Sequence, residues 1–390
     1  MGLELINGAA TATANEDASE FFAGTISPRR YSVSESLLDQ AHAFLEAMFA
    51  GRKTQHQIAE AFSTSDFTLA VFAAIDTQIQ QVMDELPAKW REYTDVMTVP
   101  DFRPTRLLTK WFDTLGLKLV PELTEYPIIG GQDHSVNWIN VAKYGGRDAF
   151  SWESQINNTL IDEFQAAPTK YGNAAAEAEA INALANLLNI DPKTNTASGF
   201  NTGFFKAGNN NAPDTRKLNA ENLDNVLDEM TRRIPSNRKR LVTPPDFLAV
   251  IPKALERQMK RILNLREIRR AETNSGTTDT QVFDNYLATV DYVVEPMLDT
   301  VLTSASKATS WFVLPKTGSR QPASFAAFLR GHEAPDMRYK STSGQRIGGG
   351  DVSPLDGSFE IDDIQTRVRH ILGHQVGDPT FTYVSDGTAS

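Results

Sequence analysis

The sequence predicts an α+β fold, because helix-like and strand-like segments follow one another without the regular alternation of a doubly wound sheet. The first observation is that residues 34–51 and 65–86 carry apolar side chains at helical spacing. The second is the C-terminal region, where turns separate short apolar runs and a longer strand-like stretch. These segments are residues 311–315, 324–332, 335–339 and 358–372.

The composition limits the classes of protein that fit this chain. Its 390 residues are enough for two or three compact units. We expect neither a membrane span nor a secretory signal, because no apolar run reaches about 18 residues and no charged segment precedes a short apolar one. Cysteine is absent, which excludes disulfides and thiolate–metal sites and fits folding in a reducing cytoplasm.

The charge is distributed unevenly. The net charge is −11, yet residues 232–270 hold 12 Lys/Arg against 3 Asp/Glu. This basic stretch could contact nucleic acid or a charged partner. A solvated helix face, or ion pairs between subunits, is favoured over that role. No recognised DNA-binding motif accompanies it, and Phe247 is its only aromatic residue, which disfavours base stacking.

The N-terminal region predicts two helices. Residues 1–30 are small and polar, so we expect a flexible terminus there. The first helix ends near Gly51, and the second follows Ser65 as N-cap and ends before Pro87. Little sequence surrounds these helices to form a shared core. We therefore expect them to pack against other subunits or a neighbouring part of this chain.

A long two-stranded ribbon is predicted within residues 107–150. Residues 115–120 and 136–141 alternate like strands, and residues 126–131 have turn chemistry. An isolated hairpin of this length is marginal in water, so we expect something else, such as a neighbouring chain, to hold it. Its aromatic residues are candidates for a subunit interface, and the alternative is that they pack on this chain's own core. They are Trp111, Phe112, Tyr126, Trp138 and Tyr144.

The central region predicts further helices. One opens at Ser151 and is interrupted at Pro168, and the next, rich in strong helix formers, runs to about residue 188. An Asn/Gly-rich loop follows, and then helices over residues 218–233 and from Pro252 onward.

The remaining elements are predicted from shorter signals. Residues 240–245 are typical of a short strand entering a turn, residues 273–280 of a polar loop and residues 290–294 of a strand. Gly373 is expected to break the chain before a last strand at residues 380–384, which we expect to pair with residues 358–372.

No motif indicates catalysis. The sequence lacks a phosphate-binding loop, a dinucleotide-binding glycine pattern and a nucleophile elbow. His370 and His374 are four residues apart, but their context is strand-like, so structural histidines are favoured over zinc ligands. We therefore predict no catalytic, cofactor-binding or metal-binding residues, no cofactor and no enzyme activity.

Several short segments, in order, resemble the major capsid proteins of tailed phages with the Hong Kong 97 fold, including the Mu-like major head subunits. They are Thr64–Phe67, Pro87–Trp90, Val99–Phe102, Lys143–Arg147, Asn157–Leu160, Val242–Pro245, Trp311–Leu314, Phe328–Gly331 and Val368–Gly373.

The resemblance implies a domain plan. In such proteins an N-terminal arm leads to an extended loop, the E-loop, which lies over an adjacent subunit, and a spine helix and sheet form a peripheral domain beside an axial domain. The implied parts are a helical N-terminal arm at 1–95, a peripheral strand at 96–105, the E-loop at 106–149, the peripheral domain with its spine helix at 150–213, the axial domain at 214–357 and peripheral C-terminal strands at 358–390.

The resemblance also implies a function. It points to a structural capsid protein that assembles as hexamers and pentamers into an icosahedral shell around double-stranded DNA, in the bacterial cytoplasm and then in the virion. Its partners would be itself, packaged DNA by non-specific contact, and scaffolding, portal or decoration proteins, without a membrane. The alternatives are a protein-cargo nanocompartment shell of the same fold, or a DNA-binding protein that uses residues 232–270.

Overall fold

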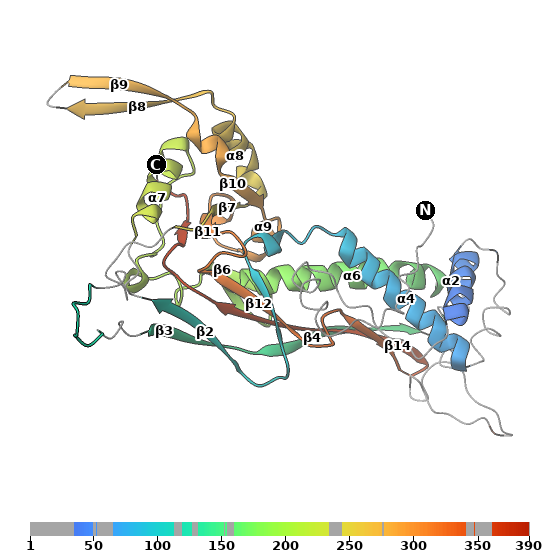
Figure 1. Cartoon of the computed structure of the whole chain (residues 1–390). Coiled ribbons are helices and arrows are strands. Elements are labelled where there is room, and N and C mark those ends of the chain that lie inside the picture. The colour runs from blue at the N-terminus through green and yellow to red at the C-terminus, as the bar shows by residue number, and fades with distance from the viewer. Residues whose placement is uncertain are drawn as a thin grey trace. The chain divides into compact units, whose positions relative to one another are not determined.

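The computed structural model describes most of the chain in two compact units. The described residues are 35–49, 52, 65–112, 119–126, 132–151, 153, 160–233, 244–274, 277–340, 347 and 361–389. The first unit comprises the described parts of 1–87, 142–178 and 328–372, and the second those of 88–141, 179–327 and 373–390. Each unit combines helices with strands, so the α+β class is confirmed (Figure 1).

The first unit contains the two expected N-terminal helices. They are α2 (Glu35–Phe49) and α4 (Ser65–Glu85), and they share a core with α6 (Leu160–Leu184). Leu45, Ile75, Ile79 and Tyr171 are almost completely removed from solvent in this core. The helices thus pack against a later part of the same chain, which was one of the two expected arrangements.

Pro168 does not interrupt α6, contrary to the prediction. The helix runs continuously past this proline, which is buried, although proline removes one backbone hydrogen bond and costs roughly 3 kcal/mol inside a helix. The neighbouring Ala167 and Tyr171 belong to the buried core, and the Tyr171 hydroxyl lies 2.6 Å from the Thr366 hydroxyl. Burial of this helix face offsets the cost. The helix expected from Ser151 falls largely outside the described residues, and Ser151 itself ends a strand.

A long strand organises the sheet of the first unit. This strand, β14 (Asp363–Val376), pairs with β13 (Asp336–Tyr339) and with β4 (Val141–Ser151). The β13 pairing is antiparallel and places Met337 opposite Val368. A Cβ on Gly145 of β4 would lie 2.4 Å from the Val368 carbonyl oxygen. Glycine therefore allows the two strands to approach closely.

The predicted break at Gly373 is wrong, because β14 continues through it to Val376. A Cβ at Gly373 would lie 2.3 Å from the Asn140 carbonyl oxygen. This glycine serves close backbone packing within a strand, and the sequence alone cannot distinguish that role from a turn.

A four-stranded sheet forms the centre of the second unit. Its order is β10-β7-β11-β15, with β10 parallel to β7 and with β11 antiparallel to both of its neighbours. The strands are β10 (Asp291–Val294), β7 (Phe247–Ile251), β11 (Trp311–Pro315) and β15 (Tyr383–Ser385). The expected strands at 290–294 and 311–315 are confirmed.

Two amphipathic helices cover one face of this sheet. They are α7 (Ala220–Thr231) and α8 (Glu256–Leu263), and they confirm the helices expected at 218–233 and after Pro252. Val226 of α7 and Met259 of α8 belong to the same buried core as Ala249, Trp311 and Tyr383 of the sheet. The opposite faces of both helices are consequently left toward solvent.

The last strand does not pair with residues 358–372 as predicted. Instead β15 pairs with β11, and Trp311 lies opposite Ser385. Alternation indicates which residues share a face, but it does not identify the neighbouring strand. The buried strand β11 needs a partner on each edge for its backbone groups, and the chain terminus provides the second.

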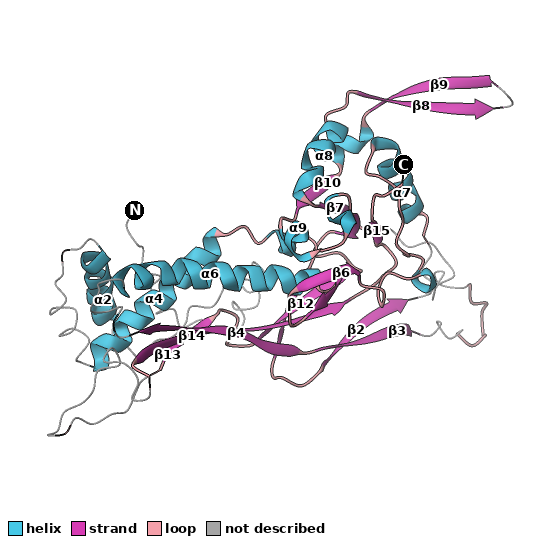
Figure 2. Cartoon of the chain, turned by 180° about the vertical axis from the view of Figure 1, so that it is seen from behind, coloured by secondary structure: helices cyan, strands magenta, loops and turns pink. Residues whose placement is uncertain are grey.

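The remaining elements of the second unit are short, and Figure 2 labels β6, β8, β9 and β12 among them. Two antiparallel pairs stand apart from the larger sheets: β5 (Leu188–Asp191) with β6 (Thr196–Phe200), and β8 (Glu267–Asn274) with β9 (Thr277–Asp284). A further neighbouring pair is β1 (Asp95–Val99) with β12 (Ser324–Leu329). The short helices are η1 (Lys89–Glu92), η2 (Ala207–Asn209), η3 (Lys253–Leu255), η4 (Tyr286–Thr289), α9 (Met297–Val301) and η5 (Ala305–Ala308).

The predicted ribbon exists, but its strands are shifted. It consists of β2 (Thr105–Phe112) and β3 (Gln132–Ile139), antiparallel to each other. Residues 119–120, expected in a strand, have no regular structure, and residues 113–118 lie outside the described residues.

The prediction of a polar loop at 273–280 is wrong, because these residues lie in the β8–β9 hairpin. The strands of this hairpin are polar and lack the apolar alternation that would have indicated them. The expectations for residues 1–30 and most of 240–245 fall outside the described residues.

The two adjacent glycines of β4 provide a matched test of the β4–β14 approach. We expect Gly145→Ala to lower the free energy of unfolding by about 1–3 kcal/mol, because its Cβ would meet the Val368 carbonyl oxygen. Gly146→Ala is the control, since nothing lies within 4 Å of its added Cβ. Urea denaturation of both variants measures the difference, and equal midpoints would contradict the observed strand packing.

Candidate assembly surfaces

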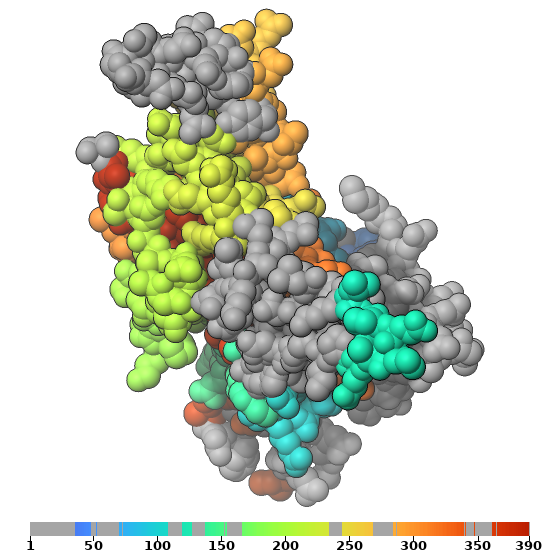
Figure 3. Space-filling view, turned by 60° about the vertical axis from the view of Figure 1, so that its left-hand side comes forward, coloured from blue at the N-terminus to red at the C-terminus, as the bar shows by residue number. Residues whose placement is uncertain are grey.

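Exposed apolar side chains are concentrated between β2 and β3. Leu119, Leu123 and Tyr126 are 95%, 102% and 82% exposed. Figure 3 shows the segment 119–126, in teal, at the molecular surface. The Thr124 hydroxyl donates a hydrogen bond of 2.7 Å to the Pro121 carbonyl oxygen, which fixes a turn in this segment. Apolar groups gathered in this way usually mark a surface that another molecule covers.

Leu123 adopts a strained backbone conformation. Its φ angle is 62°, in the left-handed region that leucine rarely occupies, at a cost of roughly 1–2 kcal/mol. Because the side chain is fully exposed, no burial within the described chain compensates for this cost. Such strain commonly occurs at functional sites.

Of the five aromatic residues predicted at an interface, Trp111, Phe112, Tyr126 and Trp138 belong to the second unit and Tyr144 to the first. Tyr126 and Trp138 are exposed in the β2–β3 region, whereas Tyr144 is 37% exposed on β4 of the first unit. Trp111 and Phe112 lie on β2, where their backbones pair with β3, and the structure does not describe their side chains. Leu119 and Leu123 were not predicted as interface residues, since Leu119 was expected in a strand and Leu123 in no element. The turn-forming Pro121 between them was the available signal.

The base of the ribbon is anchored in the second unit. Ile139 is fully buried and Leu107 nearly so. The Asn137 side-chain amide donates a hydrogen bond of 3.0 Å to the Val376 carbonyl oxygen. Beyond this base, β2 and β3 form a sheet of two strands only among the described residues. The ribbon therefore has a fixed origin and two strand edges available to a partner.

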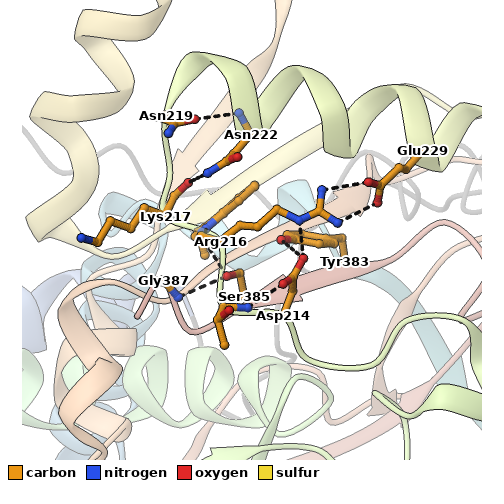
Figure 4. Close-up of polar contacts among 11 residues, drawn as sticks. Asp214, Arg216, Lys217, Asn219, Asn222, Glu229, Tyr383, Ser385 and Gly387 are labelled. Atoms are coloured by element: carbon orange, nitrogen blue, oxygen red, sulfur yellow. Dashed lines mark hydrogen bonds and ion pairs between the residues drawn. The ribbon is translucent and has the colours of Figure 1, made fainter. Parts of the chain in front are cut away.

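A second candidate surface lies where the C-terminal strand β15 meets α7. We call the contacts of Asp214, Arg216, Glu229 and Tyr383 there the C-terminal joint, and the Arg216 guanidinium group is at its centre (Figure 4). The group lies 2.5 Å from an Asp214 carboxylate oxygen and donates to both Glu229 carboxylate oxygens, at 2.9 and 3.0 Å. It also lies 5.8 Å from the centre of the Tyr383 ring, and the Tyr383 hydroxyl donates to Asp214 at 3.0 Å.

The backbone of the same joint is also fixed. The Arg216 carbonyl oxygen accepts hydrogen bonds from the Trp311 indole at 2.9 Å and the Ser385 hydroxyl at 2.7 Å. Gly387 has a φ angle of 64°, and a Cβ there would lie 2.3 Å from the Thr309 carbonyl oxygen. Asn219 caps α7 by accepting a hydrogen bond from the Asn222 N–H at 2.7 Å (Figure 4). The orientation of α7 is thus determined by its contacts with the last strand.

The joint shifts the pKa values of its charged groups. Burial acts to raise the pKa of Asp214, but hydrogen bonds from the Thr215 N–H, the Tyr383 hydroxyl and Arg216 outweigh it and lower that pKa below its ordinary value. The hydrogen bonds to Glu229 raise the pKa of Arg216. Because the folded pKa of Asp214 is depressed, its contribution to stability is present above the unfolded pKa and is lost as the pH falls through the folded one.

The described part of the basic stretch is only partly neutralised. Arg232 pairs with Asp228 at 2.8 Å, and the Arg233 guanidinium donates to the Thr382 carbonyl oxygen at 2.6 Å. Lys253 and Lys260 both bond to Glu256 at 2.5 and 2.6 Å, and these bonds lower the pKa of Glu256 to about 2. Residues 234–243 of the stretch lie outside the described residues.

The structure gives no indication of a metal centre or a membrane span in the part of the chain that it describes. No group of three or more His, Asp or Glu residues is placed there to hold a metal ion. No described helix is both long and apolar enough to cross a membrane. His370 is buried, and the His374 Nδ1 atom lies 3.0 Å from the Asn182 side-chain oxygen.

Comparison with known proteins identifies the family. The family model described as "Phage capsid protein" matches residues 137–385, more than half of the chain. This chain belongs to the phage capsid protein family. The predicted family and its structural role in the virion capsid are therefore confirmed, and such a protein associates with copies of itself.

Solved structures similar to this capsid protein include phage capsids. A chain of Gordonia phage Cozz is 14% identical with a TM-score of 0.41, over 75% of this chain and 84% of its own. A chain of the mature capsid of bacteriophage PhiM1 is 10% identical with a TM-score of 0.41, and the match covers 76% of this chain and 86% of its own. A chain of a virus-like particle from Pyrococcus furiosus is 11% identical with a TM-score of 0.39, and the match covers 80% of this chain and 98% of its own. No curated protein matches the sequence.

Removing the Arg216 side chain tests the C-terminal joint. We expect Arg216→Ala to lower the free energy of unfolding of this capsid protein by about 1–3 kcal/mol at pH 7, because it leaves Asp214 and Glu229 without their charged partner. The loss should shrink as the pH falls and Asp214 becomes protonated. Lys217→Ala, at an exposed neighbouring side chain, is the control and should change stability by less than about 0.5 kcal/mol. A pH-independent loss measured by chemical denaturation would contradict this role of Asp214.

Proposed function

We propose that this capsid protein is the major shell subunit of a tailed phage, with a fold of the Hong Kong 97 type. Copies assemble as hexamers and pentamers into an icosahedral shell that encloses double-stranded DNA. Assembly takes place in the bacterial cytoplasm, and the chain has no catalytic role. The observation that carries the proposal is the family assignment of residues 137–385.

The E-loop of the proposed plan corresponds to residues 106–149, with the β2–β3 ribbon as its main part, whereas β4 at the end of this range pairs with β14 in the sheet of the first unit. An anchored base, two available strand edges and exposed apolar side chains at 119–126 support its contact with a neighbouring copy. Burying such side chains is worth roughly 1.5–3 kcal/mol each. A contact of this kind would also compensate for the strained backbone of Leu123.

The other parts of the plan are proposed as follows. Residues 1–95 form the N-terminal arm, and α6 is the spine helix of the peripheral domain, supported by its packing against residues of β14. Residues 214–357 form the proposed axial domain, except that β13 pairs with β14 and therefore belongs with the peripheral strands. The proposed peripheral strands at 358–390 keep only β14 in the sheet with β13 and β4, since β15 pairs with β11. Scaffolding, portal and decoration proteins are the proposed further partners, and packaged DNA makes non-specific contacts.

The apolar residues between β2 and β3 test the proposed contact. We expect Leu123→Ser combined with Tyr126→Ser to leave the melting temperature of the unassembled protein unchanged, because both side chains are exposed. Shell formation should fall at least tenfold, because the neighbouring copy would lose the apolar groups that it covers. Negative-stain microscopy and sedimentation measure the shells.

Glu122→Ser with Glu125→Ser is the matched control in the same segment, and it should still form shells. Normal shells from the Leu123/Tyr126 variant would sink the proposed contact. If the unaltered protein formed no shells, the shell function itself would be wrong. Shells that contain protein cargo and no DNA would favour the nanocompartment alternative.

A further inference from the structure

The β8–β9 hairpin projects from the second unit without support from another strand of the described chain. Its eight register pairs join β8 and β9 to each other, and neither strand pairs elsewhere in the residues that the structure describes. Figures 1 and 2 both show the hairpin leading away from α8. At roughly 3.4 Å per residue, its eight pairs span about 27 Å. A hairpin of two strands is marginal in water alone, so we expect a partner to hold its far end.

The base of this hairpin is fixed in the core of the unit. The Asn285 side-chain amide, directly after β9, donates hydrogen bonds to the Ile262 and Leu263 carbonyl oxygens at 2.9 and 3.0 Å. The Asn285 N–H donates to the Arg266 carbonyl oxygen at 3.3 Å, which joins the two ends of the hairpin. Ile262 and Leu287 belong to the buried core that α8 shares with the sheet. The hairpin therefore has an anchored base at the end of α8.

The far half of the hairpin is acidic. Residues 271–280, which we call the tip, contain Glu272 and Asp279 and no basic residue. The register places these two residues directly opposite each other, and like charges in that arrangement destabilise a strand pair. Each is five residues from the base of its strand, a span of about 17 Å. A basic partner would therefore stabilise the tip, and that partner has to lie well beyond the base of the hairpin.

A basic surface lies on and next to α8. Its exposed basic residues are Lys253, Arg257, Lys260, Arg261 and Arg266. Glu256 bonds to both Lys253 and Lys260. Arg257 and Arg261 are four residues apart, so they share a face of the helix, and no described carboxylate lies within ion-pair distance of either one. We call these two arginines the basic face of α8, and this face is available to carboxylates of a partner.

We propose that the β8–β9 hairpin of one copy reaches a neighbouring copy and packs its tip against the basic face of α8 there. The inference rests on the proposed shell function, which supplies the neighbouring copy. The tip is out of reach of α8 in its own copy, because the hairpin begins at the end of that helix and leads away from it (Figures 1 and 2). Each chain therefore carries both halves of a contact that only two chains can make.

The chemistry of the two surfaces favours this partner over others. Arginine binds a carboxylate through two parallel hydrogen bonds, so the basic face of α8 suits an acidic protein surface. The acidic tip would repel the phosphates of a nucleic acid. Two tips, or two basic faces, would repel each other as well, so the charges allow only the pairing of a tip with an α8 face.

Charge reversal on one surface at a time provides the first test. The tip variant carries Glu272→Lys and Asp279→Lys, and the helix variant carries Arg257→Glu and Arg261→Glu. Each variant alone should form at least tenfold fewer shells than the unaltered protein, because like charges would then meet. A variant with all four substitutions should recover assembly, because the two surfaces are again opposite in sign. Sedimentation and negative-stain microscopy measure the shells.

Two controls accompany these variants. A variant with Lys193→Glu and Lys206→Glu repeats the charge change of the helix variant at exposed lysines elsewhere, and it should assemble normally. Circular dichroism and thermal melting show whether each variant is folded. If a reversed chain does not fold, the neutral pair Glu272→Gln with Asp279→Asn replaces the tip variant, and it should lose part of the dependence of assembly on salt concentration.

Cross-linking provides a second test that does not depend on the yield of shells. The chain contains no cysteine, so introduced cysteines react without competition. A variant with Thr280→Cys and Lys260→Cys keeps all four residues of the proposed contact. A short bis-maleimide should join its copies into covalent oligomers, measured by denaturing electrophoresis. The control with Thr280→Cys and Lys193→Cys should remain monomeric under the same conditions.

Several results would overturn the proposal. Normal assembly of the tip variant or of the helix variant is one, and a four-substitution chain that folds but does not assemble is another. Cross-links confined to single chains would show that the tip meets α8 of its own copy. If the helix variant assembled but lost binding to duplex DNA, the basic face would be a nucleic-acid surface instead. Failure of the unaltered protein to assemble is a separate result, since it would overturn the shell function itself.

Discussion

The second unit depends on the pairing of β11 with two strands that are far from each other in the sequence. Every residue of β11 is buried, so its backbone groups cannot bond to water and must be paired on both edges. One edge is paired by β7 and the other by β15, which lies at the C-terminal end of the described chain. The sheet is incomplete until that end is in place.

The same constraint extends to the helices. Arg216 connects the last strand to α7, since its carbonyl oxygen accepts from Trp311 and Ser385 while its guanidinium group bonds to Glu229. The apolar side of α7 then enters the core that α8 also enters. Once the buried faces are determined, the charged faces of both helices are determined too. The surface that the second unit presents is therefore a consequence of how its core is closed.

The exposed apolar segment shows the opposite relation between fold and surface. Leu119, Leu123 and Tyr126 contribute nothing to a core in the described chain, and Leu123 adds backbone strain. In a protein that remained alone in solution, this segment would be a liability. In a capsid protein, copies meet at high local concentration, and groups that cost stability in the free subunit can stabilise the shell.

The sequence by itself determined the helices α2, α4, α7 and α8, whose apolar side chains recur at helical spacing, and the strand β11, which is a short continuous apolar run. It also indicated a ribbon and placed Tyr126 and Trp138 in it. Tertiary structure decided the partner of β15, the continuity of α6 through Pro168 and of β14 through Gly373, and the true ends of the ribbon strands. Alternation and turn residues report local conformation, whereas strand partners, close backbone approaches and the contacts of Arg216 with Trp311 and Ser385 arise between segments that are far apart in the sequence. Those long-range contacts leave no local pattern, which is why only the folded chain shows them.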